Sequence, residues 1–326
     1  MAALLLGLLG CAEPEPELAP AAEDVAPEPA DVPVEPPPEL AGQGQPVLAR
    51  ARDLVLFADG AELHVPYMAA RMVPVGEMVD LENPNSFTID VETIEVRIPE
   101  QTLGAAFGRG SGGEEPPFKD VTVTTEGDTL VLKGHARTLG LPFTFRADPI
   151  VTESGKLALA LEQVHVLGIG VKGFVGAFEG QIEDAANERQ RHLLDVEKDL
   201  LVIDPFPFAG PPEIHTSFRS VEVRERSIVA RLGEPPDQAD ALPEPGLVLS
   251  GGVIREDSTL LFDVVLALLP RDGGSLVIDP DRLNEQIRAG FTKLAAERIA
   301  IYVAPLAELD DEGDAEEGAS TKDAAP

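Results

Sequence analysis

Apolar and polar residues alternate along much of the middle of the chain, a pattern typical of β-strands that bury one face. Residues 54–65 are interrupted by an Asp-Gly pair and residues 121–134 by a Glu-Gly-Asp turn, which predicts a hairpin in each segment. The same reasoning predicts hairpins over residues 141–166 and 214–232. The pattern therefore indicates an antiparallel meander.

The segment at residues 86–98 changes phase once. Its apolar residues fall on odd positions up to Val91 and on even positions from Ile94 onward. An extra residue near Glu92 would produce this shift, so the sequence predicts a β-bulge in a bent strand. Residues 99–107 then predict a short helix that begins with proline.

A long amphipathic helix is predicted over residues 171–194. Its apolar residues recur at spacings of three and four, which places them on one face. At a rise of 1.5 Å per residue this helix would be about 36 Å long. A strand over residues 157–166 and a turn rich in glycine precede the helix, and a short strand at residues 200–203 follows it.

The order of these segments predicts an α+β fold, in which a long curved antiparallel β-sheet wraps around the long amphipathic helix. Such an arrangement encloses an apolar groove that suits a chain-like ligand. The side chains expected to line the groove are Phe143, Phe145, Leu157, Leu159, Leu161, Val171, Phe174, Phe178 and Ile182. The same residues are also compatible with a packed α+β core without a cavity, because cores and apolar cavities are lined by the same residue types.

Composition divides the chain into six parts. They are a lipoprotein signal peptide with its lipobox (1–11), a disordered tether rich in proline and glutamate (12–46), a main domain (47–232), a linker (233–246), a small C-terminal β/α extension (247–306) and a disordered acidic tail (307–326).

The extension has a regular pattern of its own. It predicts strands at residues 247–254, 259–269, 275–278 and 298–303. A helix is expected over residues 280–294, because Asp279 can cap it and Pro280 suits its first turn.

Charge is distributed unevenly along the chain, whose formal net charge is -33. Residues 1–49 contain acidic residues and no Lys or Arg, and residues 308–326 contain a single lysine among their acids. This balance disfavours binding to nucleic acid, because phosphates need Lys and Arg. It also disfavours electrostatic docking on anionic lipid.

The only cysteine, Cys11, follows a short apolar run and Gly10. This arrangement resembles a bacterial lipobox, which implies cleavage before Cys11 and acylation of its thiol. The alternative is an apolar N-terminus with a buried cysteine. The run is too short to cross a bilayer, which takes about 20 residues.

Residues 168–173 match the dinucleotide-binding pattern G-x-G-x-x-G, and Asp204 ends the next strand. The spacing to Asp204 is too long, prolines follow it at once, and no further β-α-β unit is present, so we reject a nucleotide site. The five histidines are far apart in sequence, and no motif of a hydrolase or metalloprotease occurs. We expect no cofactor, no metal site and no catalytic residue.

Four features carry a family resemblance. They are Asn83-Pro84-Asn85-Ser86-Phe87 ahead of a strand and a short helix, the hairpin at 121–134 that ends in glycine, the strand at 157–169 that leads into the long helix, and the Asp-Pro pair after residues 200–203. In these features residues 83–232 resemble the LmeA-like phospholipid-binding proteins, which are related to the tubular lipid-binding (TULIP) proteins. The resemblance implies a TULIP-like fold that holds or passes membrane lipid and catalyses no reaction.

We therefore expect a membrane-anchored lipoprotein of the cell envelope that binds or transfers lipid acyl chains and is not an enzyme. Its expected partners are the membrane, through acylated Cys11, and a lipid or phospholipid ligand. The alternative is a structural or assembly lipoprotein whose acidic segments recruit a protein partner in the envelope. Ala12 after Cys11 suits the periplasmic face of the outer membrane in a host with two membranes.

Overall fold

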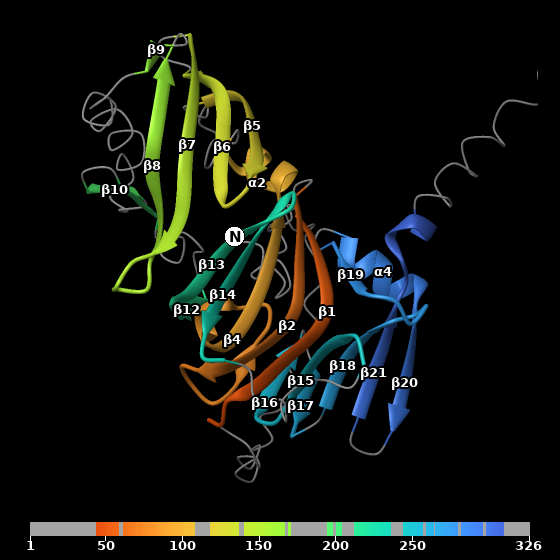
Figure 1. The fold of residues 1–326 in the computed structure, drawn as a ribbon. Coiled ribbons are helices and arrows are strands. Elements are labelled where there is room, and N and C mark those ends of the chain that lie inside the picture. The colour runs from red at the N-terminus through yellow and green to blue at the C-terminus, as the bar shows by residue number, and fades with distance from the viewer. Residues whose placement is uncertain are drawn as a thin grey trace, which may run out of the picture.

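The computed structural model consists mainly of β-strands, which form three sheets (Figure 1). It describes residues 44–58, 61–107, 118–136, 140–166, 169–170, 194–197, 200–203, 212–235, 244–256, 259–263, 265–279, 282–295 and 298–309. Helices within these residues are short: η2 (Pro84–Ser86), α2 (Glu100–Phe107), α4 (Leu283–Ala289) and one turn at 306–309. None of the described helices has the length and apolar character needed to cross a membrane.

The largest sheet has eleven strands, with the long hairpin of β1 and β2 near its middle. Its main order is β13-β14-β4-β2-β1-β15-β18-β21-β20, while β12 pairs with β4 and β19 with β1. The strands are β1 (Val47–Ala58), β2 (Ala61–Pro74), β4 (Phe87–Pro99), β12 (Glu213–His215), β13 (Phe218–Arg224), β14 (Ser227–Gly233), β15 (Gly246–Ser250), β18 (Val265–Pro270), β19 (Leu276–Ile278), β20 (Phe291–Ala295) and β21 (Arg298–Val303).

β1 has hydrogen-bonded neighbours along both of its edges. β2 pairs with it antiparallel over its whole length, whereas the other edge pairs first with β15, antiparallel, and then with β19, parallel. The change of partner occurs at Asp53, whose φ of 48° lies in the left-handed region that Asp tolerates better than most residues. Residues 246–278 therefore share a sheet with the first described strand.

The phase change predicted in residues 86–98 is confirmed as a β-bulge in β4. The register between β2 and β4 passes from Ala69 opposite Thr93 to Ala70 opposite Val91, so Glu92 is the extra residue. The bulge keeps the apolar residues on both sides of it in the same core. The predicted short helix is also confirmed, as α2.

The second sheet has seven strands and is built from the chain between α2 and β12. Its order is β10-β11-β8-β7-β6-β5, with β9 paired to β8. The strands are β5 (Phe118–Glu126), β6 (Thr129–Ala136), β7 (Leu141–Val151), β8 (Leu157–Val166), β9 (Ile169–Gly170), β10 (Leu194–Glu197) and β11 (Leu200–Ile203). The hairpins predicted at 121–134 and 141–166 are confirmed.

Two apolar clusters form the interior of these sheets. The larger one lies against β1, β2, β4 and the C-terminal strands, and Leu54 and Leu56 are 1% exposed within it. The smaller one lies on the second sheet and includes Val123, Leu132 and Ile228. Because Ile228 belongs to β14, the second sheet is packed against the first.

The third sheet is small, with the order β17-β16-β3. It joins β3 (Val79–Asp80) to β16 (Val253–Glu256), and β17 (Thr259–Phe262) is its outer strand. Gly251 and Gly252, both at positive φ, separate β15 of the large sheet from β16. They end the strand that was predicted to run over residues 247–254.

The predicted α+β architecture, a long curved antiparallel sheet wrapped around a long amphipathic helix, is wrong. The described residues are mainly strand, and α2, with 8 residues, is their longest helix. Of the helix predicted at 171–194, residues 171–193 lie outside the described residues and Leu194 begins β10. The apolar face of the second sheet packs against β13, β14 and α2, which supply burial that the sequence analysis assigned to a helix.

The helix predicted over residues 280–294 is also wrong in its second half. α4 ends at Ala289, and after Gly290 the chain forms β20, which pairs with β21 from Phe291 opposite Tyr302 to Ala295 opposite Arg298. A Cβ atom at Gly290 would collide with the carbonyl oxygen of Tyr302, so the chain turns here at a residue without a side chain. Pairing with a neighbouring strand outweighed the local preference for helix.

Gly233→Ala should destabilise the protein more than Gly127→Ala. Both glycines have positive φ, 68° and 66°, and left-handed strain alone costs about 1–2 kcal/mol. A Cβ at Gly233 would also collide with the Glu92 carbonyl at the bulge, whereas no atom lies within 4 Å of one at Gly127. We expect a loss of roughly 2–4 kcal/mol in the free energy of unfolding for Gly233→Ala. Denaturant unfolding followed by circular dichroism checks this, and equal losses would contradict the clash.

Candidate functional site

The structure brings some of the predicted lipid-lining residues together. Phe143, Phe145 and Leu159 lie in the smaller apolar cluster, where Phe143 is 5% and Leu159 4% exposed. Leu157 packs against the larger cluster instead. The side chain of Leu161 is not described, and Cys11, Val171, Phe174, Phe178 and Ile182 lie outside the described residues.

Phe143 is held by protein on two sides. Its ring stacks on Phe145 with 4.5 Å between centroids, because the two residues share one face of β7. Across the strand pair it faces Gly134, where a Cβ atom would lie 2.9 Å from the Phe143 ring. Glycine at this position therefore makes room for the ring.

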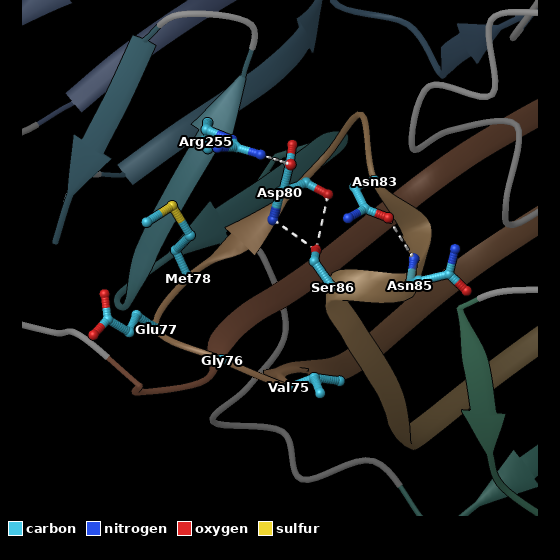
Figure 2. Close-up of a pocket in the computed structure, with 9 residues that line it drawn as sticks. All are labelled: Val75, Gly76, Glu77, Met78, Asp80, Asn83, Asn85, Ser86 and Arg255. Carbon is cyan, nitrogen blue, oxygen red and sulfur yellow. Dashed lines mark hydrogen bonds and ion pairs between the residues drawn. The ribbon is translucent and has the colours of Figure 1, made fainter.

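A hollow of about 350 Å³ lies elsewhere, where β3 and the turn after it meet β16. It is lined by Val75, Gly76, Glu77, Met78, Asp80, Asn83, Asn85, Ser86 and Arg255 (Figure 2). Figure 2 shows Val75, Glu77 and Met78 along one side, and Asn83, Asn85 and Ser86 along the other. None of the lining residues was predicted as a site residue.

The turn that carries the hollow is ordered by its own side chains. Asn83 caps η2 by accepting a hydrogen bond from the Asn85 N–H at 3.2 Å, and Pro84 occupies the first helical position. The Ser86 hydroxyl accepts from the Asp80 N–H at 2.9 Å and donates to the Asp80 carbonyl at 3.1 Å. Beneath the turn, Phe87 is 1% exposed in the larger cluster. The rim is therefore fixed to the core.

Asp80 and Arg255 form the electrostatic centre of the hollow. The Arg255 guanidinium donates to one oxygen of the Asp80 carboxylate, and the Glu82 N–H donates to the other at 3.2 Å. Asp80 is 4% exposed, so its charge needs these partners. The hydrogen bond from Arg255 lowers the pKa of Asp80, against the opposing effect of burial, and the same bond raises the pKa of Arg255.

The remaining lining of the hollow combines polar groups with the apolar side chains of Val75 and Met78. Asn83 and Asn85 present side-chain amides, Glu77 presents a carboxylate, and Val75, at 72% exposed, adds an apolar contact. The lining contains no histidine, cysteine or other nucleophile paired with a base. This combination of donors, acceptors and two apolar side chains, Val75 and Met78, is compatible with binding a peptide segment.

Only part of this site has a local signal in the sequence. The Asn-Pro-Asn-Ser run is a turn signature, which predicts the turn but not the hollow beside it. Arg255 lies 175 residues after Asp80, and nothing near either residue indicates the pairing. The contact depends on β3 pairing with β16, which is a property of the tertiary structure.

The other sequence motifs have simple structural roles where they are described. Ile169 and Gly170 of the glycine motif form β9, an antiparallel partner of β8. Nδ1 of His215 in β12 lies 2.8 Å from Oδ1 of Asp90 in β4, within hydrogen-bonding distance. This hydrogen bond raises the pKa of His215. Among the residues that the structure describes, no group of three His, Cys, Asp or Glu side chains could hold a metal ion.

Comparisons with protein-family models, with curated proteins and with solved structures gave no match for this chain. The candidate site therefore has to be judged on its own geometry.

Arg255→Gln should lower the thermal unfolding midpoint at pH 7 and have little effect in acid. The pKa of Asp80 is lowered in the folded protein, so its stabilising effect is present above the unfolded pKa, near 4, and is lost as the pH falls through the folded pKa. Removal of the guanidinium leaves an ionised Asp80 without its main partner, which destabilises the folded protein. A protonated Asp80 carries no charge and is affected much less. Thermal unfolding between about pH 7 and pH 3 measures how the loss in unfolding midpoint caused by Arg255→Gln depends on pH.

Arg288→Gln is the matched control for this experiment, because Arg288 is exposed on α4 and no carboxylate is paired with it among the described residues. This variant should unfold like the unaltered protein at every pH. A loss for Arg255→Gln that persists unchanged in acid would show that the guanidinium acts through packing and not through Asp80.

Proposed function

We propose that the protein is an acylated lipoprotein of the cell envelope whose folded part binds a partner protein and catalyses no reaction. Cys11 would carry the lipid anchor, and the acidic, proline-rich segment after it would act as the tether. This assembly role is the alternative that the sequence also allowed. The proposal gives up the lipid-filled groove, because the sheet-around-helix architecture that required the groove is wrong.

The observation that carries the proposal is the location of three of the five exposed large apolar side chains of the described residues. Leu260 lies on β17, and Phe291 and Leu294 lie on β20, at 40%, 42% and 78% exposed. Both strands are the outer strands of their sheets among the described residues. Outer strands present unpaired backbone groups, which other protein chains can use for pairing.

The described apolar residues that were predicted to bind lipid do not support a lipid-filled groove. Phe143 and Leu159 are buried by neighbouring side chains of the protein itself. Their burial supports a filled core at this part of the second sheet. A filled core leaves the edges and the hollow as the surfaces for recognition.

Charge adds a preference for the kind of partner. A net charge of -33 favours association with a basic surface and opposes self-association. The N–H of Gly44 donates to the carbonyl of Glu77 at 2.8 Å, so the chain enters the fold beside the hollow. A partner held at the hollow would therefore lie close to the tether.

Cys11→Ser should release the protein from the membrane fraction of a bacterial host that processes lipoproteins. Acylation supplies the proposed anchor, and a buried CH₂ group of an acyl chain contributes about 0.8 kcal/mol to membrane binding. Metabolic labelling with a palmitate analogue and fractionation of the membranes measure both effects. Ala12→Ser is the matched control and should keep label and location. Unchanged labelling of Cys11→Ser would contradict acylation at this residue.

Native mass spectrometry of the full chain carrying Cys11→Ser should give the mass of the protein without a bound lipid. The reason is that the apolar residues described in the second sheet are already covered by protein.

In a parallel measurement, a basic partner identified by cross-linking in intact cells should bind more weakly as salt rises, because the acidic chain attracts it electrostatically. In the mass spectrometry measurement, a stoichiometric lipid that survives gentle desolvation would overturn the proposal in favour of a lipid carrier.

A further inference from the structure

β20 lies at the outer end of the eleven-stranded sheet (Figure 1). It pairs with β21 on one side, and none of the described strands pairs with its other edge. All five of its residues are exposed. An exposed outer strand with apolar side chains is unusual in a soluble sheet, since such edges are normally covered or shortened.

The backbone of β20 offers hydrogen-bonding groups to a further strand. Along an antiparallel pair, residues alternate between those bonded to the neighbour and those whose N–H and C=O point away. Ala295 and Arg298 flank the two-residue connection of the hairpin, a position that a hydrogen-bonded pair fills. This assigns Thr292 and Leu294 to the outward set.

The two faces of this edge differ in chemistry. On one face the rings of Phe291 and Tyr302 stack with 4.4 Å between centroids, and the Lys293 ammonium lies 5.3 and 4.8 Å from them. On the other face Leu294 is opposite Ile299, which packs against the larger apolar cluster. An added strand would therefore meet aromatic and cationic groups on one face and aliphatic groups on the other.

Lys293 and Arg298 give the edge a local positive charge in a chain of net -33. Both residues are exposed, and no carboxylate among the described residues forms an ion pair with either. They lie on the same face, because Arg298 is opposite Ala295, two residues after Lys293. On an added strand, one carboxylate would face Lys293, and a second, two residues along, would face Ala295, with Arg298 one strand further on the same face.

A second copy of this chain fits the edge poorly. A strand of five residues is about 17 Å long, and pairing along it buries far less than the roughly 1,200 Å² of a stable dimer. Self-pairing centred on Lys293 would also place two lysines opposite each other. An extended peptide segment needs no more than this length of edge.

We propose that β20 binds, by strand addition, an extended segment in which acidic and aliphatic side chains alternate, carried by a partner whose surface is otherwise basic. Backbone pairing with Thr292 and Leu294 supplies affinity, and the cations and Leu294 select the side chains. The inference rests on the proposed function, since it names the surface and the kind of segment through which the protein holds its partner.

The test uses the full chain carrying Cys11→Ser and a fluorescent octapeptide of alternating valine and threonine, in which two threonine positions, two residues apart, carry glutamate. Fluorescence anisotropy should show saturable binding. Leu294→Asp and Thr292→Pro should each weaken it about tenfold or more, because one removes the aliphatic contact and the other an outward N–H. Lys293→Glu should reverse the preference, so that a matched lysine peptide binds better than the glutamate peptide.

Two controls keep the result interpretable. Ile150→Asp changes an exposed apolar residue on β7, an inner strand of the second sheet, and should leave binding unchanged. The glutamate peptide with N-methyl groups on alternate residues should fail to bind the unaltered chain, and this result does not depend on the folding of any variant.

Equal binding of the glutamate and lysine peptides, binding of the N-methylated peptide, or full binding to Leu294→Asp would each overturn the inference. The proposed function fails by different evidence, namely a stoichiometric bound lipid. A basic partner that still binds to Leu294→Asp would therefore leave the proposed function standing and would remove β20 as its surface.

Discussion

Hydrogen bonding along both edges of β1 is the constraint on which the rest of the structure depends. β1 carries Leu54 and Leu56 into the larger apolar cluster, and a buried backbone group without a partner costs about 1–3 kcal/mol. β2 fills one edge, but the other edge needs β15 and β19, which come from the last third of the chain. The large sheet is therefore complete only when distant segments have joined. Asp53, at positive φ, marks the change from one partner to the next.

The candidate site is a consequence of the same pairing. Once β15 is fixed beside β1, Gly251 and Gly252 redirect the chain into β16, which pairs with β3. This brings Arg255 to Asp80 across 175 residues and closes one side of the hollow. The other side is built locally, by a turn that its own side chains order. A long-range pairing and a short-range turn together make one hollow beside Gly44, the first described residue.

The distribution of apolar residues separates the interior of the protein from its exposed strand edges. Two clusters bury the inner faces of the large sheets and join through Ile228 of β14. Sheet-on-sheet contact thereby buries the apolar face that the sequence pattern predicted to lie against a long helix. The exposed apolar side chains lie mostly where a sheet ends, and on β20 they occur together with Lys293. Strong overall acidity opposes the pairing of such edges with copies of the same chain.

The sequence by itself determined the local structure. Alternation and turn residues predicted the hairpins, and the change of phase in residues 86–98 predicted the bulge at Glu92, because each depends only on residues close together along the chain. Tertiary structure decided what lies against each strand. It turned residues 291–295 from the predicted helix into β20, covered the second sheet with β13 and β14, and joined Asp80 to Arg255. The free energy of these pairings comes from burial and hydrogen bonds between distant segments, which no short stretch of sequence contains.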